Sequence, residues 1–270
     1  DSWTCRYLGV VALNSIRVIR WPKCQIIFDS LSINFVIVKK EPLQKNSPCS
    51  HDNNNGDKRM EHDNASPAVT SHRHGRVWVI TVNNPPVNAL SAAVRLGLFD
   101  AIEQGEAQPE VGAVLIVSEG KTFIAGADIR EFGKPPVPPS LPDVCNRIEA
   151  CSKPVVVALQ GAALGGGLEV ALSAHYRLAL PGAKVGLPEV DLGLMPGAGG
   201  TQRAPRLMGA KAAAEFMLSG KPLGAHAALE AGLVDHVIDS SLTALDAGLA
   251  YANELLAQGA PIRRVRDIAI

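Results

Sequence analysis

Two short runs of the chain contain only apolar residues, namely residues 111–117 (VGAVLIV) and residues 154–159 (PVVVAL). A strand that is apolar at every position, rather than at every second one, is typical of a sheet that is buried on both faces. Helix-like segments separate these runs from other strand-like ones, so the two kinds of element alternate along the chain. This alternation predicts an α/β layered fold with largely parallel strand pairing.

The remaining elements follow from local signals after Gly75. Ser91 and Asp143 each precede apolar residues at helical spacing, and their side-chain oxygens suit the N-cap position of a helix. The predicted strands span residues 77–82, 111–117, 154–159, 176–180 and 233–238. The predicted helices span residues 91–102, 143–151, 210–217 and 225–231.

The first 74 residues differ in composition from the rest of the chain. Residues 47–74 form a polar tract with little to bury, so we expect residues 1–74 to be a largely disordered leader. Upstream sequence read through to a start at Met60 is the alternative source of this segment. His72 and His74 have no acidic or cysteine partner at ligand spacing, so no metal site is predicted there. Residues 75–270 are predicted to form the folded domain.

Charge and cysteine usage exclude several classes of function. The sequence has 26 basic and 26 acidic residues, so without a basic excess we do not expect binding to nucleic acid or anionic lipid. Its five cysteines form no CxxC pair, which favours reduced thiols and a cytoplasmic location. The most apolar stretch near the start, residues 25–38, is too short and too polar to span a membrane.

A glycine-rich turn, residues 161–174 (GAALGGGLEVALSA), lies between the second apolar run and a helix. Its three consecutive glycines remove every Cβ and let a ligand approach the backbone, and the helix start offers unpaired N–H groups. We therefore expect the turn to stabilise negative charge on an oxygen atom. Close packing of the helix against a strand is the alternative. The dinucleotide pattern GxGxxG does not fit, and no Walker lysine follows.

Glu169 is the only charged residue in the helix after this turn, which is otherwise apolar on all sides. Such a helix is normally buried, and a buried glutamate has a raised pKa that suits a general acid or base near neutral pH. The structural alternative is a buried ion pair with Arg177 or Arg203. Because perturbed carboxylates cluster at active sites, we favour the functional interpretation.

Two further segments are candidates for the same site. Glu189 lies in a loop rich in glycine and proline, where its neighbour Asp191 is even the better candidate on charge grounds. Residues 123–131 (FIAGADIRE) follow the first apolar run and expose main-chain N–H groups at a small-residue turn. This turn lies near the ends of the buried strands, where open α/β sheets place ligands. A simple strand-to-helix turn capped by Asp128 is the alternative.

Four motifs, in this order and spacing, give the chain a family resemblance. They are PPVNAL (residues 85–90), FIAGADIRE (residues 123–131), KPVVVALQGAALGGGLE (residues 153–169) and GLPEVDLGLMPGAGGTQR (residues 186–203). Over residues 75–240 the sequence resembles the crotonase (enoyl-CoA hydratase/isomerase) superfamily. It is most similar to the N-terminal hydratase/isomerase part of bacterial multifunctional fatty-acid oxidation proteins. The resemblance implies a spiral of ββα turns with two roughly perpendicular sheets, followed by C-terminal helices.

The resemblance also implies roles for individual residues. The N–H groups of Ala127 and Gly166 would bind the thioester oxygen and stabilise the enolate, and losing one such donor typically costs about 3 kcal/mol. Glu169 would activate the attacking water, and Glu189 would give a proton to the α-carbon. The residues expected to contact the acyl-CoA substrate or the water are Asp128, Ile129, Arg130 and Gly197.

Both glutamates are present, so the resemblance implies hydration of trans-2-enoyl-CoA to 3-hydroxyacyl-CoA in β-oxidation, with no metal and no cofactor beyond the acyl-CoA substrate. The alternatives are a Δ3-Δ2-enoyl-CoA isomerase and a non-catalytic fragment that binds acyl-CoA.

PPVNAL lacks the lysine that some members place just before Asn88, which removes one phosphate contact. The chain ends at residue 270, so we expect a truncated helical region. The expected partners are further copies of the chain or a dehydrogenase domain.

Overall fold

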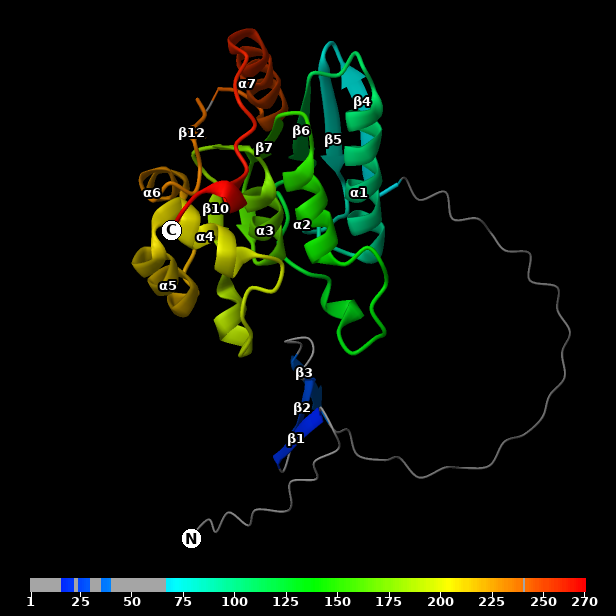
Figure 1. The fold of residues 1–270 in the computed structure, drawn as a ribbon, viewed down its shortest axis with the longest axis vertical. Helices are drawn as coiled ribbons and strands as arrows, with labels where there is room; N and C mark the ends of the chain where they lie inside the picture. The colour runs from blue at the N-terminus through cyan, green and yellow to red at the C-terminus, as the bar shows by residue number, and fades with distance from the viewer. Residues whose placement is uncertain (1–15, 22–23, 30–34, 40–66, 240) are drawn as a thin grey trace, which may run out of the picture. The chain divides into compact units, whose positions relative to one another are not determined.

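The computed structural model describes residues 16–21, 24–29, 35–39, 67–239 and 241–270 (Figure 1). The chain divides into two compact units, Asp1–Ala65 and Ser66–Ile270. In the first unit, three strands form an antiparallel sheet with the order β1-β2-β3. These strands are β1 (Ile16–Trp21), β2 (Cys24–Asp29) and β3 (Phe35–Lys39). The other residues of the predicted leader before residue 67 lie outside the described residues.

A six-stranded sheet with the order β12-β9-β7-β6-β5-β4 is the centre of the second unit (Figure 1). β4 and β5 pair antiparallel, and each other neighbouring pair is parallel, which confirms the predicted pairing. The strands are β4 (Val69–His74), β5 (Val77–Val82), β6 (Ala113–Ser118), β7 (Val155–Leu159), β9 (Tyr176–Ala179) and β12 (His236–Val237).

The apolar runs lie in the middle of this sheet and are buried on both faces. Every residue of β6 and β7 is buried. Alternate side chains of each strand point into two different cores: Ile116 packs with residues of α1 and α2, whereas its neighbour Leu115 packs with residues of α7. Since both faces are covered, the strands have no polar face, as the sequence predicted.

Helices and short 3₁₀ turns connect the strands. The helices are α1 (Ala92–Ala107), α2 (Leu141–Ala150), α3 (Gly166–Ser173), α4 (Gly200–Met208), α5 (Ala210–Ser219), α6 (Ala225–Glu230) and α7 (Ala244–Gln258). The 3₁₀ turns are η1 (Ile129–Glu131), η2 (Pro188–Leu192) and η3 (Val265–Asp267). No helix in the described part of the chain is long and apolar enough to cross a membrane.

A second, three-stranded sheet has the order β11-β10-β8. Its strands are β8 (Ala162–Leu164), β10 (Lys184–Gly186) and β11 (Leu223–Gly224), with β8 parallel and β11 antiparallel to β10. The chain passes from β7 in the large sheet to β8 in the small one and then into α3. It repeats the step from β9 to β10, so successive turns wind between two sheets as the predicted ββα spiral does.

Three predictions about elements need correction. The domain begins before residue 75, because β4 pairs with β5 over six residues, from Val69 opposite Val82 to His74 opposite Val77. The N-cap of α2 is Ser140, and Asp143 instead accepts a hydrogen bond from the Ser140 N–H in a capping box. The last strand shrinks to two residues, because only these pair with β9.

Candidate active site

The glycine-rich turn joins β8 to α3, and two of its glycines are required by the protein itself. Gly165 has a φ of +52°, a left-handed conformation that side chains disfavour. A Cβ on Gly167 would lie 2.1 Å from the carbonyl oxygen of Ile124. Close packing therefore explains part of the triple glycine, alongside the predicted role in binding.

The turn places the two predicted oxyanion donors near each other. A Cβ on Gly166 would lie 4.0 Å from the backbone nitrogen of Ala127. A parallel bridge from Ile124 to Ala163 holds the two segments side by side, and a second bridge joins Ala127 to Leu90. Within residues 67–239 and 241–270, neither the Ala127 N–H nor the Gly166 N–H donates a hydrogen bond. Two main-chain donors are thus available to an oxygen atom of a ligand.

Glu169 is buried, with 2% of its surface exposed, in the first turn of α3. Its Oε1 accepts hydrogen bonds from the N–H groups of Ala198 at 2.7 Å and Gly200 at 2.8 Å. Burial raises the pKa of Glu169, while these two hydrogen bonds and the charge of Arg203 act in the opposite direction. The side chain is therefore desolvated, as predicted, but its ionised form keeps specific support.

The two arginines proposed as alternative partners of Glu169 bind other acids. Arg203 donates to Glu149 at 2.8 Å, and Arg177 lies 3.5 Å from Asp235. The alternative of a structural ion pair at Glu169 is therefore wrong. Sequence reasoning missed the actual partners because main-chain N–H groups carry no residue-specific signal. The only available sign was the small-residue run Gly197–Gly200, which lets the chain pass close to a carboxylate.

Glu189 is half-buried in η2, and its carboxylate lies next to the glycine turn. A Cβ on Gly165 would lie 3.3 Å from Oε1 of Glu189. Its Oε2 is buried and has no hydrogen-bond partner among the described residues. Burial raises the pKa of Glu189 to about 7, and the negative charge of Glu169 acts in the same direction. Asp191, the competing candidate, is exposed.

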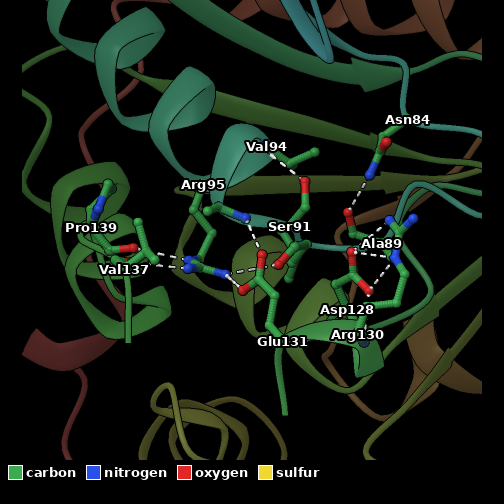
Figure 2. A network of polar contacts seen from close by, with 12 residues as sticks. Asn84, Ala89, Ser91, Val94, Arg95, Asp128, Arg130, Glu131, Val137 and Pro139 are labelled. Atoms are coloured by element: carbon green, nitrogen blue, oxygen red, sulfur yellow. Dashed lines mark hydrogen bonds and ion pairs between the residues drawn. The ribbon is translucent and has the colours of Figure 1, made fainter. Parts of the chain in front are cut away.

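The residues after Ala127 form a short exposed segment around η1 (Figure 2). Asp128 is the N-cap of η1, as the structural alternative proposed, and its buried carboxylate accepts hydrogen bonds from the Arg130 main chain and guanidinium. These hydrogen bonds lower the pKa of Asp128 to about 2. Ile129 and the Arg130 side chain are about three-quarters exposed and free to meet a ligand. Asp128 was predicted to contact the substrate. Its carboxylate already accepts hydrogen bonds from Arg130, so a substrate would have to share it with that arginine.

Gly197, the residue predicted to hold the attacking water, directly precedes Ala198. It lines an open pocket of about 380 Å³ between α2, α4 and the C-terminal segment. The lining residues are Pro142, Asn146, Glu149, Gly197, Ala198, Gly199, Gln202, Arg203, Arg206 and Arg266. The loop that carries Gly197 therefore lines this pocket and also donates two N–H groups to the Glu169 carboxylate.

The geometry brings complementary chemistry to one turn. Glu169 is a carboxyl group held by two main-chain donors, Glu189 is a carboxyl group that keeps its proton up to about pH 7, and the N–H groups of Ala127 and Gly166 are unused. Such a set can stabilise negative charge on a carbonyl oxygen while protons move at neighbouring carbon atoms.

Comparison with known proteins identifies the family. The family model described as enoyl-CoA hydratase/isomerase matches residues 72–266. The chain belongs to this family. It is 50% identical over 165 residues to a peroxisomal bifunctional enzyme of Danio rerio, covering 61% of the chain and 23% of that protein. It is 45% identical over 165 residues to a probable enoyl-CoA hydratase of Bacillus subtilis (strain 168), covering 58% of the chain and 64% of that protein.

The fold of this enoyl-CoA hydratase/isomerase family member agrees with solved structures. The crystal structure of enoyl-CoA hydratase from Mycobacterium tuberculosis H37Rv is 34% identical and superimposes with a TM-score of 0.67. The match covers 71% of this chain and 77% of that one. These findings confirm the predicted crotonase-type fold. The chain spans about a quarter of the bifunctional relative and less than two thirds of the bacterial one.

Proposed function

We propose that the chain catalyses the hydration of trans-2-enoyl-CoA to 3-hydroxyacyl-CoA in fatty-acid β-oxidation. The pairing of Glu169 and Glu189 at one glycine turn carries this proposal, because hydration needs one group that takes a proton and one that gives a proton. The unused N–H groups of Ala127 and Gly166 and the names of the relatives support it.

The two carboxyl groups suit different steps of the reaction. Glu169, whose Oε1 is held by Ala198 and Gly200, takes a proton from water as the water oxygen bonds to C3 of the substrate. Electrons move from the C2–C3 double bond to the thioester oxygen, where the N–H groups of Ala127 and Gly166 stabilise the enolate. Glu189, with a pKa of about 7, then gives its proton to C2. Water thus supplies the hydroxyl group on C3, and its proton on Glu169 replaces the one that Glu189 gives to C2 once it passes to Glu189, which restores both carboxyl groups. We propose the reaction without a cofactor.

Double-bond migration is a second candidate activity of the same site. Glu189 has a pKa of about 7, so it can both give and take a proton near neutral pH. One carboxyl group with this property suffices to move a proton between C2 and C4 of a Δ3-enoyl thioester. We therefore propose enoyl-CoA isomerase activity beside hydration, with Glu189 alone as the acid and base.

The test follows the loss of absorbance of crotonyl-CoA with wild-type protein, Glu169→Gln, Glu189→Gln and the control Asp191→Asn. Asp191 is an exposed acid two residues from Glu189 and outside the site. We expect each glutamate variant to lower kcat by about 10²- to 10⁴-fold, and the control to match wild type. Equal rates in all four proteins would contradict the proposal. Binding of crotonyl-CoA without turnover by wild type would indicate the non-catalytic fragment.

The partner of the chain and its cellular compartment are also proposals. We propose that it works with a 3-hydroxyacyl-CoA dehydrogenase, as a domain or a subunit, because the product of hydration is the substrate of such an oxidation and one relative is named a bifunctional enzyme. We also propose a cytoplasmic location, supported by two buried free thiols, Cys145 and Cys151. The name of the Danio rerio relative places that protein in peroxisomes, so a fluorescent fusion should distinguish the two compartments.

A further inference from the structure

Arg95, on the first turns of α1, joins three separate segments of the chain (Figure 2). Its Nη1 donates to Oε2 of Glu131 at 2.7 Å and to the Leu90 carbonyl oxygen at 3.0 Å. Its Nε donates to the carbonyl oxygen of Pro139 at 2.9 Å, and its Nη2 donates to that of Val137 at 3.0 Å. Only 11% of the side chain is exposed, and the bonds to Glu131, Leu90 and Pro139 are partly buried.

Two of these contacts connect Arg95 to the chain before and after Ala127. Upstream, Leu90 accepts from Arg95 through its carbonyl oxygen and donates through its N–H to the Gly126 carbonyl oxygen at 2.9 Å. Downstream, Glu131 binds both Arg95 and, through Oε1, the Ala92 N–H at 2.6 Å. One guanidinium thus anchors the chain before and after residue 127.

Main-chain hydrogen bonds hold the chain just before Ala127, where the Ala125 N–H donates to Val87 and the Leu90 N–H donates to Gly126, but side-chain packing around Ala127 itself is sparse. Ala127, Ile129 and Arg130 are exposed, so they contribute little packing. A main-chain donor stabilises an oxyanion only if it is held within a few tenths of an ångström of its productive position. A planar guanidinium bound to a carboxylate and three carbonyl oxygens fixes direction as well as distance, which a lysine cannot do.

We propose that Arg95 is a positioning residue that fixes the backbone N–H of Ala127 for the thioester oxygen. This proposal rests on the proposed function, because it assigns the Ala127 N–H to the enolate. Arg95 contacts neither carboxyl group of the site, so its loss acts through the loop. The expected signature is a lower kcat with little change in KM, since the enolate depends on this donor more than the bound substrate does.

Arg147 provides a matched control. It is a comparably buried arginine on α2, with 19% of its side chain exposed, and it forms an ion pair with Glu106 on α1. None of its hydrogen bonds reaches residues 124–133. Arg147→Met therefore removes the ion pair of a comparably buried arginine without touching the loop that carries Ala127.

The first experiment needs no turnover. Hydrogen–deuterium exchange of peptides covering residues 124–133 is compared in wild type, Arg95→Met, Arg95→Lys and Arg147→Met. We expect exchange to be at least tenfold faster in Arg95→Met, intermediate in Arg95→Lys and unchanged in Arg147→Met. Unchanged exchange in both Arg95 variants, or an equal increase in Arg147→Met, would overturn the proposal. If Arg95→Met does not fold, the exchange rates of residues 124–133 in Arg95→Lys and Arg147→Met are compared instead, and faster exchange in Arg95→Lys alone supports the proposal.

The second experiment measures crotonyl-CoA hydration by the same proteins. We expect Arg95→Met to lower kcat at least tenfold with KM within threefold of wild type, Arg95→Lys to recover part of the loss, and Arg147→Met to match wild type. A wild-type kcat in Arg95→Met would overturn the positioning role. A wild-type protein without turnover would contradict the proposed function instead, and the exchange result would still decide whether Arg95 holds the loop.

Discussion

Oε1 of Glu169 accepts a hydrogen bond from the Ala198 N–H at 2.7 Å, across 29 residues of sequence. The loop that follows η2 is therefore fixed to the carboxylate that we propose as the base. The N–H of Gly200 donates to the same oxygen, and no group in the described part of the chain donates to the other oxygen, Oε2. The position of this carboxylate depends on the path of the loop backbone as much as on α3.

Gly200→Ala should disturb the carboxylate without removing it. A Cβ at this position would lie 3.1 Å from Oε1 of Glu169 and 2.8 Å from Cβ of Pro196, so one of them must move. Because small misplacements of a catalytic group are costly, we expect kcat for crotonyl-CoA to fall about 10- to 100-fold. Gly224→Ala is the control, since no atom lies within 4 Å of its Cβ. Equal kcat values for both variants would contradict this dependence.

The buried ion pair between Arg203 and Glu149 gives a prediction about stability. Only 6% of the Arg203 side chain and 2% of the Glu149 side chain are exposed, and Glu149 also accepts from the Arg266 N–H. Glu149→Ala would leave a buried guanidinium without its carboxylate, so we expect unfolding to require about 3–5 kcal/mol less. Denaturant unfolding measures this loss. Arg263→Ala, which removes a pair exposed on the arginine side, should cost at most about 1 kcal/mol.

The central strands of the large sheet could be predicted from the sequence because they are buried on both faces. Every residue of β6 is buried, so selection for apolar side chains acts at every position and the strand is visible as an apolar run. Glu169 was predictable on the same ground, because a single charge in an apolar helix must have a function or a partner. By contrast, β4 at the sheet edge is mostly exposed, and a polar edge strand resembles a disordered tract.

What the sequence did not reveal depends on main-chain groups or on distant contacts. The partners of Glu169 are N–H groups, which every non-proline residue has. Glu189 acquires its raised pKa from burial and from Glu169, and both depend on how η2 packs against the glycine turn. Arg95 is an ordinary helix residue until the fold brings Glu131 and the carbonyl oxygens around it.

The N-cap of α2 illustrates a local ambiguity that a mutation can check. Ser140 and Asp143 are both good capping residues, and the structure uses them reciprocally: each accepts a hydrogen bond from the other's N–H. Ser140→Ala removes the cap itself, so we expect a loss of about 1 kcal/mol of stability. Thermal unfolding of Ser140→Ala beside Ser241→Ala, whose side chain lies in an exposed turn, measures it. A larger effect at Ser241 would contradict the assignment.

The raised pKa of Glu189 should appear as a pH-dependent cost to the folded state. The folded pKa is about 7 and the ordinary value is 4.5, so between these pH values the folded protein binds more protons than the unfolded chain. Stability is therefore lost as pH rises through this window. Glu189→Gln removes the titration, so its thermal midpoint should equal that of wild type near pH 4 and exceed it above pH 7. Asp191→Asn, at an exposed position two residues away, controls for the loss of one acidic side chain from η2. A constant difference between Glu189→Gln and wild type would mean that Glu189 ionises normally, and it could not then supply a proton near neutral pH.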